Sequence, residues 1–462
     1  MQPQMQIETE MQLQTEVEIL PQVAEVPAAK VSSAAEAQPY WSLATRLAFR
    51  FSFVYLVLLG ISFPSFPLRY LPGVSFLVQK YTQLLHIVIP WVAKHILRLS
   101  YEITVFTNGS GDTTYDWVLM LFWLTMAALV TVVWSGLARQ RTNHEKLFQW
   151  VRVYLRLSLA TGMIIYGSVK VFPLQMSLPS FAKLLQPYGD ASPMGILWTS
   201  IGASPAYTIF TGSVELLGGI LLIFPRLLTL GSLVSGIAMF EVFMINMCYD
   251  VPVKIFSFHM ILMAAFLLAP DMPRLTNLLI LNRPTEPVQR PPFFRRKWFN
   301  RVAVAVPILF GLYILGTNLY GARQSYMNHP RNRPKPPLYG VWMVEEFSLD
   351  GQARPPLTTD QARWQRMIFQ FPGSTVIQPM TGPNQAYRVE VDIEKKTFKL
   401  SKASDQNWKA DFAFEQTTPE LITLEGQMDG HKTQAKLRRF DESKFLLLNR
   451  GFRWINEGPF NR

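Results

Sequence analysis

The sequence has little cysteine and little charge. Cys248 is the single cysteine among 462 residues, so an intrachain disulfide, a cysteine-based cluster and a cysteine zinc site are excluded. Charged residues make up 16% of the chain, well under the roughly 25% of an ordinary soluble domain. This shortage of charge goes against a soluble protein.

Motifs for common cofactors are also missing. The chain has no GxGxxG, P-loop, HExxH or haem-attachment pattern, and no motif for flavin or iron–sulfur binding. His86 and His95 are nine residues apart, which does not put both on one helical face, and His259 has no second histidine or cysteine nearby. We therefore expect no metal site and no cofactor bound by a motif. If the protein takes part in redox chemistry, the cofactor belongs to a partner.

What the chain does have is long apolar runs. Apolar residues make up 49% of it, its mean hydropathy is +0.14, and several runs approach the twenty residues that cross a bilayer. We predict an integral membrane protein in contact with the lipid bilayer. About seven spans are expected, at 43–63, 117–137, 154–172, 206–224, 227–247, 254–269 and about 300–317.

The segment FLVQKYTQLLHIVIPWVAKHIL, 76–97, is apolar but repeatedly interrupted. Lysines, histidines and a proline break it at irregular intervals. We expect an amphipathic helix that lies at the membrane interface. A transmembrane helix within 76–100 is the alternative that stays open.

The distribution of charge predicts how the chain is oriented. Residues 1–38 are rich in glutamate and contain a single basic residue, which predicts a disordered acidic tail and not a signal peptide. The segments 138–153 and 273–301 are rich in lysine and arginine, whereas 173–205 holds only Lys183. The positive-inside rule then predicts a multi-pass protein of the inner (plasma) membrane with a cytoplasmic N-terminus and an extracytoplasmic C-terminal region. The net charge of +12 is explained by these loops, and no nucleic-acid partner is expected.

From residue 338 the chain changes character. Short β-prone runs such as RMIFQF, YRVEVDI, TFKLS, LITLEG and KFLLLN alternate with turn signals such as GPNQ, EKKT and MDGHK. Eight or nine strands at this spacing favour an antiparallel sandwich or barrel. A meander closed on itself would leave no exposed edge. The expected fold is therefore an all-α polytopic membrane helix bundle followed by a C-terminal antiparallel β-barrel.

These features divide the chain into five expected parts. They are a cytoplasmic tail at 1–38, an N-terminal transmembrane region with the interfacial helix at 39–150, a four-helix membrane domain at 151–283, a basic linker with the last span at 284–334, and the extracytoplasmic β domain at 335–462.

The four-helix part resembles a known family. PYGDASPMG (187–195), GSVELLGGILLIFPRLLTLG (212–231) and the spans that end in LLAPDMPRL (267–275) are similar to the DoxX-like family of small four-helix membrane proteins. The resemblance covers about 150–283, under a third of the chain. It implies thiosulfate–quinone oxidoreduction or membrane complexes that handle redox stress. The three additional spans and the β domain depart from the family's minimal form.

The β domain resembles a lipocalin-like barrel. Gly340, Val341 and Trp342 form a GxW pattern where the first strand begins. Arg450 and Arg453 lie in LNRGFRWINE, read as the last strand. The resemblance implies that an arginine from the end of the barrel packs on Trp342.

Polar residues occur at bilayer depth in the four-helix part, most densely in EVFMINMCYDVPVKIFSFHM (241–260). Such groups are costly in a membrane, roughly 2.5–3.5 kcal/mol each, and persist where they pair, face a cavity or act chemically. By depth they gather toward the outer leaflet, so we expect one outward-facing polar cavity for a ligand or for protons. Its expected residues are Tyr166, Lys170, Glu215, Glu241, Asn246, Asp250, Lys254 and His259.

A structural explanation of the same residues stays open. Gly212, Glu215 and Gly219 lie close to one stripe of a helix, where small residues let helices approach and a glutamate can bond a neighbour. Glu241 has no such stripe and is the stronger candidate for a ligand or proton site. In GSGDTTYD (109–116), a helix cap from threonine or aspartate is favoured over a cation site.

Two functions of different classes follow. The first is a DoxX-like component of a membrane redox, quinone-handling or lipid-handling system, with a quinone or another small apolar ligand in the outer cavity and a membrane redox partner. The second is a non-catalytic transport or assembly protein whose intramembrane charges are structural. The sequence leaves open whether the protein is an enzyme and what its substrate, partner and oligomeric state are.

Overall fold

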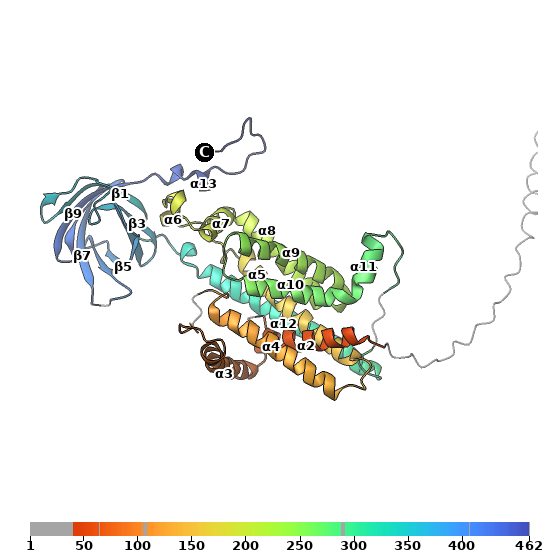
Figure 1. Cartoon of the computed structure of the whole chain (residues 1–462). Coiled ribbons are helices and arrows are strands. Elements are labelled where there is room, and N and C mark those ends of the chain that lie inside the picture. The colour runs from red at the N-terminus through yellow and green to blue at the C-terminus, as the bar shows by residue number, and fades with distance from the viewer. Residues whose placement is uncertain are drawn as a thin grey trace, which may run out of the picture.

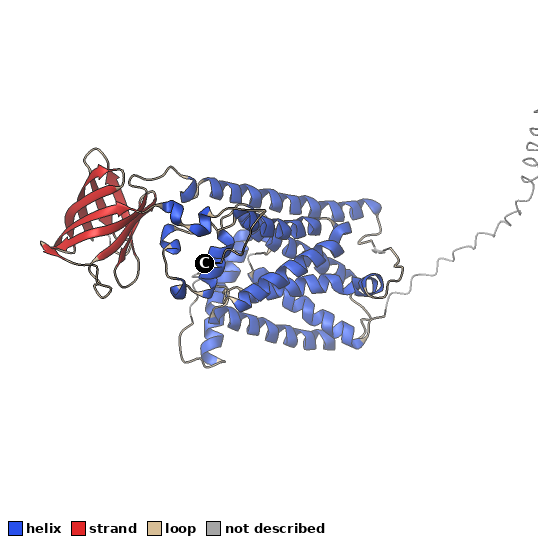
Figure 2. Cartoon of the chain, turned by 90° about the horizontal axis from the view of Figure 1, so that it is seen from above, coloured by secondary structure: helices blue, strands red, loops and turns tan. Residues whose placement is uncertain are grey.

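The computed structural model describes residues 40–63, 65–103, 105, 109–287, 292–405 and 407–461. The predicted acidic tail at 1–38 lies outside the described residues. Figure 1 shows a bundle of helices with a β-barrel beyond one end of it, and Figure 2 shows the same separation from above. The predicted combination of helical bundle and barrel is confirmed.

Six helices in the described part of the chain are long and apolar enough to cross a membrane. This protein is therefore membrane-embedded, and six of the predicted spans are matched. The helices are α2 (Leu43–Ser62), α4 (Thr114–Leu137), α8 (Pro205–Ile223), α9 (Leu228–Cys248), α10 (Lys254–Leu268) and α12 (Lys297–Met327).

The span predicted at 154–172 forms α5 (Glu145–Val171), but α5 is not one of these six apolar helices. It carries charges near both ends, from Glu145 to Lys170. It packs against α2, α8, α10 and α12, and Leu155, Leu159 and Met163 are fully buried. Since its neighbours shield it from lipid, α5 tolerates charge that an exposed spanning helix would not.

The remaining helical elements lie between these helices or after the barrel. They are η1 (Pro67–Tyr70), α3 (Val74–His95), α6 (Phe181–Leu184), η2 (Tyr188–Asp190), α7 (Pro193–Gly202), η3 (Pro225–Leu227), η4 (Ala269–Asp271), α11 (Met272–Leu279), η5 (Pro330–Asn332), η6 (Glu442–Lys444) and α13 (Leu446–Asn449).

Helix α3 has three distinct faces, as an interfacial helix needs. One face, with Leu85, Ile89 and Val92, is buried against the bundle. A second face exposes large apolar side chains, including Ile87 and Trp91. The third face is polar, and α3 does not run parallel with the spanning helices in Figure 1. These three faces suit a helix that lies between protein, acyl chains and water.

The C-terminal domain is a closed antiparallel barrel. Neighbouring strands pair in the order β2-β1-β3-β4-β5-β6-β7-β8-β9, and β1 also pairs with β9, so eight strands close and β2 is an extra strand beside β1. The predicted eight or nine strands are confirmed. Their bounds are β1 (Gly340–Leu349), β2 (Gln352–Ala353), β3 (Trp364–Phe371), β4 (Ser374–Pro379), β5 (Gln385–Asp392), β6 (Thr397–Ser401), β7 (Lys409–Thr418), β8 (Leu421–Met428) and β9 (His431–Arg439).

The barrel interior is filled by side chains. Trp342, Phe369, Phe398 and Phe412 are almost completely buried in one apolar cluster with residues from the other strands. Alternation is clear in the first part of β7, where Ala410, Phe412 and Phe414 are buried and the residues between them are exposed. An eight-stranded barrel is just wide enough for side chains to fill, so this interior is a packed core.

The predictions for the end of the barrel were partly wrong. KFLLLN was read as a strand, but Leu446–Asn449 is the short helix α13. Arg450 and Arg453 lie beyond the last strand and are not part of the barrel. The strand prediction for KFLLLN failed because a run of leucines fits a short helix as well as a strand. The two arginines that follow this run were therefore also assigned to the barrel. The basic residue opposite the buried Trp342 in the β1–β9 register is Arg439.

The barrel rests on the bundle through a small apolar contact. Phe181 of α6 is buried in one cluster with Val341, Ile368 and Phe445 of the C-terminal domain. The Phe181 backbone N–H donates to Gln370 Oε1 at 2.8 Å. Because α6 lies in the connection between α5 and α8, this contact ties the barrel to the four-helix part.

The packed core predicts that residues 335–462 fold alone. Trp342 is 2% exposed, so Trp342→Ala should lower the free energy of unfolding of this fragment by about 3–5 kcal/mol. Denaturant unfolding followed by circular dichroism measures the change. Trp454→Ala is the control, because this side chain is 90% exposed and its loss should have little effect. A disordered fragment, or equal effects of both changes, would contradict the packed-barrel assignment.

Candidate functional site

A buried ion pair joins α5 and α8. Lys170 of α5 donates to Glu215 Oε1 of α8. Their side chains are 7% and 3% exposed. The bond from Glu215 to a neighbouring helix, which the small-residue stripe suggested, is present in this pair.

Glycines bring the two helices together at this level. A Cβ added at Gly212 would lie 2.5 Å from Lys170 Cβ, and one added at Gly167 would lie 2.7 Å from Leu216 N. Small residues allow such close approach of membrane helices. The charged groups of Lys170 and Glu215 therefore meet because the backbones of α5 and α8 are close.

Two further predicted residues lie on α5 and α9. Tyr166 is one turn before Lys170 on α5, and its ring packs against Phe256 with centroids 5.5 Å apart. Glu241 is exposed on α9, and it forms no ion pair within the described ranges. The second Glu215 oxygen, Oε2, is buried and has no hydrogen-bond partner among the described residues.

His259 belongs to a separate buried group. Its Nδ1 is 2.6 Å from the Ile255 carbonyl oxygen, and its Nε2 is 2.6 Å from the Tyr55 hydroxyl. A carbonyl oxygen only accepts, so we assign the proton to Nδ1, and Nε2 then accepts from Tyr55. This neutral tautomer satisfies both ring nitrogens and joins α10 to α2.

The remaining predicted residues form two groups near the turn between α9 and α10. The amide of Asn246 donates to Ser257 Oγ at 3.0 Å. Lys254 Nζ lies 3.0 Å from Asp250 Oδ1 and 3.8 Å from Asp112 Oδ2. Within the described part of the chain, the predicted cavity residues thus occupy separate polar groups, and Lys254 has carboxylate partners other than Glu215 and Glu241.

Asp112 caps a helix that is remote in sequence. Its two carboxylate oxygens accept from the backbone N–H groups of Lys254, at 2.7 Å, and Ile255, at 2.9 Å. A carboxylate at this position satisfies free donors at the α10 N-terminus and complements the helix dipole. Thr113 and Asp116 form the expected cap at the start of α4, a reciprocal capping box. The sequence suggested a local cap but contained no signal for the bond from Asp112 to α10.

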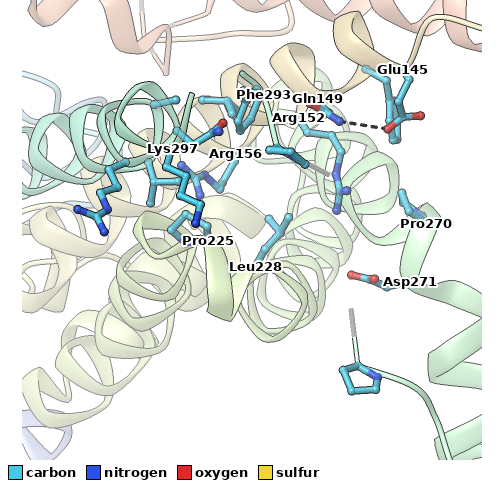
Figure 3. A pocket seen from close by; sticks show the side chains of 18 of the residues that line it. Glu145, Gln149, Arg152, Arg156, Pro225, Leu228, Pro270, Asp271, Phe293 and Lys297 are labelled. Atoms are coloured by element: carbon cyan, nitrogen blue, oxygen red, sulfur yellow. Dashed lines mark hydrogen bonds between the residues drawn. The ribbon is translucent and has the colours of Figure 1, made fainter. Parts of the chain in front are cut away.

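Sequence reasoning also missed a basic cavity at the end of the bundle away from the barrel. The cavity has a volume of about 1040 Å³. Arg152 and Arg156 of α5 and Lys297 of α12 extend into it in Figure 3. In the sequence, Arg152 and Lys297 belong to basic segments that mark topology, and Arg156 falls within the span predicted at 154–172. A signal was present, since Arg152 and Arg156 are four residues apart and share one helical face.

Comparison with known proteins gives one curated relative. No family model matches the chain, and no solved structure matches it. The chain is 31% identical over 118 residues to the uncharacterized protein YwoB of Bacillus subtilis (strain 168). The match covers 25% of this chain and 73% of the relative.

The Asp112 cap predicts that Asp112→Asn destabilises the protein. The asparagine has one acceptor oxygen where two helix N–H groups need partners, and a buried donor left without a partner costs about 1–3 kcal/mol. Asp250→Asn is the matched control, because Asp250 also pairs with Lys254 but its side chain is 87% exposed. The apparent Tm of the detergent-purified protein should fall for Asp112→Asn and stay close to wild type for Asp250→Asn. Equal shifts would mean that the bond to α10 contributes nothing.

Proposed function

We propose that this chain, which belongs to the family of the Bacillus subtilis protein YwoB, is a DoxX-like membrane protein that handles a small apolar ligand of the quinone or lipid class. The Lys170–Glu215 pair carries this proposal. Two ionisable groups are kept buried inside a membrane bundle, where each alone costs roughly 2.5–3.5 kcal/mol. The ligand's polar head is the part that these groups would recognise.

The pair has the chemistry that a quinone headgroup requires. The Lys170 ammonium donates hydrogen bonds, and quinone carbonyl oxygens accept them. Glu215 Oε2 is buried without a hydrogen-bond partner among the described residues, so a ligand hydroxyl has an acceptor there. Electrons for any redox step come from a membrane redox partner, since this chain has no motif for a redox cofactor.

The filled barrel supports a role for the β domain outside the ligand site. Its core is occupied by Trp342, Phe398, Phe412 and their neighbours, so a ligand is not carried inside it. We assign the outer surface of the barrel to contacts with a partner. The lipocalin-like resemblance then concerns strand arrangement and not ligand transport.

The proposed location is the inner membrane, with the N-terminus in the cytoplasm. The basic segments favoured as cytoplasmic meet at one end of the bundle. Arg46 of α2 donates to the Arg141 carbonyl oxygen at 2.8 Å, and Arg50 donates to the Ala138 carbonyl oxygen at 3.2 Å. The barrel lies at the opposite end (Figure 1), which supports an extracytoplasmic β domain.

A structural role for the ion pair is the second candidate. The close contact between Gly212 and Lys170 Cβ favours this reading, because a tightly packed helix pair leaves little room for a ligand. In that case the protein is a non-catalytic transport or assembly factor, and the pair specifies how α5 and α8 associate.

The two candidates differ in their response to removing the pair. Glu215→Gln leaves the Lys170 charge buried and should destabilise the protein by about 3–5 kcal/mol. A Glu215→Gln/Lys170→Met variant removes both charges and should regain most of that stability. If the pair binds a ligand, the double variant is stable but no longer retains a quinone or lipid that co-purifies with wild type. Thermal unfolding and mass spectrometry of extracted small molecules give the two measurements.

Glu241→Gln is the matched control. It makes the same chemical change on an exposed position of α9 and should leave both stability and ligand retention unchanged. A stable double variant that retains the same small molecules as wild type would refute the ligand site and favour the structural role.

The proposed orientation predicts which positions a membrane-impermeant thiol reagent reaches. On a Cys248→Ala background, Ser192→Cys and Ser404→Cys should be labelled in intact cells, and Thr142→Cys only after lysis. All three positions are exposed, so a difference in labelling reports the side of the membrane. Labelling of Thr142→Cys in intact cells, with protection of Ser404→Cys, would mean that the orientation is the opposite of the proposed one.

A further inference from the structure

The cavity at the end of the bundle opposite the barrel gathers positive charge from three helices. Its walls carry five basic residues, Arg152, Arg156, Arg274, Lys297 and Arg301, and three acidic residues, Glu145, Asp271 and Glu286. This excess of positive charge surrounds about 1040 Å³ of space. Like charges held together repel one another, so an anion in this space would stabilise the arrangement.

The basic side chains come as two helical pairs. Arg152 and Arg156 are four residues apart on α5, and Lys297 and Arg301 are four residues apart on α12. Residues at this spacing lie on the same helical face. Each helix therefore presents two cationic groups to the cavity, and Figure 3 shows those of Arg152, Arg156 and Lys297 extending into it.

The acidic residues do not cancel this charge evenly. Asp271 accepts a hydrogen bond from Thr229 at 2.6 Å, and its other oxygen lies 3.6 Å from Arg274. Glu145 accepts a long bond of 3.5 Å from Gln149. The strongest acidic contacts thus lie beside α11, and the α12 side of the cavity carries Lys297 and Arg301.

The surroundings of the cavity match the boundary between membrane and water. Trp150 and Phe293 are in ring contact, with centroids 5.1 Å apart, and Trp298 is exposed. Aromatic residues of this kind gather at the level of lipid headgroups. The cavity wall also includes Ala303 and Val304 of α12, and Val304 is exposed on a helix that faces lipid along most of its length.

We propose that this cavity binds the phosphate of an anionic phospholipid headgroup. Arginine recognises phosphate through two parallel N–H donors, and lysine adds a point charge. The apolar wall at Ala303 and Val304 leads from the phosphate site toward the acyl region, which suits a lipid better than soluble phosphate. Basic pockets between membrane helices have this chemistry. The proposal does not depend on the Lys170–Glu215 pair or on its ligand.

The test compares two variants with the same change in charge. Lys297→Gln/Arg301→Gln removes two basic groups from the cavity wall. Arg295→Gln/Arg296→Gln removes two exposed basic residues from the same segment that do not line the cavity. All four side chains are exposed, so neither variant disturbs the core. Circular dichroism and the apparent Tm confirm that both variants are folded.

Binding is measured by native mass spectrometry of the full-length protein in an uncharged detergent, titrated with phosphatidylglycerol or phosphatidylcholine. Wild type should retain phosphatidylglycerol in preference to the zwitterionic phosphatidylcholine. Lys297→Gln/Arg301→Gln should weaken the affinity for phosphatidylglycerol by about tenfold or more, the loss expected for charge-assisted hydrogen bonds. The control variant should bind like wild type.

Three other outcomes would contradict the proposal. Equal loss of lipid in both variants would mean that general surface charge attracts it. Equal binding of the two lipids would remove the recognition of net negative charge. If inorganic phosphate at millimolar concentration binds to the cavity and phosphatidylglycerol does not, the site serves a soluble anion and not a lipid.

Discussion

The burial of α5 is the constraint on which the bundle depends. This helix carries Lys170 at one end and Arg152 and Arg156 toward the other, and lipid would oppose each of these charges. Helices α2, α8, α10 and α12 pack around it, so they can be apolar toward the membrane. In α12 the only buried residues along its described length are Gly311, Ile314 and Ala322. Two of the buried charged side chains of the bundle, Arg156 and Lys170, lie on this enclosed helix.

Much of this fold could be predicted from the sequence, because the length of an apolar run and the alternation of residues in a strand are local signals. The spans and the strand count follow from such patterns. The structure that follows the last barrel strand was harder to predict. Leu446–Asn449 forms a helix where a strand was expected, since four leucine-rich residues fit either state. The span at 154–172 was recognised, yet its role as the enclosed central helix depends on neighbours that the pattern does not specify.

The candidate site was predictable only in part, for a related reason. Depth along the helices identified Lys170 and Glu215, and glycines nearby indicated close packing. Depth does not give the direction in which a side chain points, so exposed Glu241 and buried His259 were assigned to the same cavity. Tyr55, the partner of His259, is 204 positions away in the chain. Arg152 follows the positive-inside pattern and Arg156 falls within the span predicted at 154–172, so their convergence with Lys297 of α12 was not apparent.

The bond from Asp112 to the start of α10 has a consequence for biosynthesis. The loop that carries Asp112 is made long before Lys254 and Ile255 leave the ribosome, and within the described residues no side chain of α10 itself caps their N–H groups. The two partners meet only if α4 was inserted with its first residue on the side where α10 begins. An inverted α4 would leave the new helix end unsatisfied at the membrane surface. Correct insertion of the first half of the chain is thereby linked to completion of the second half.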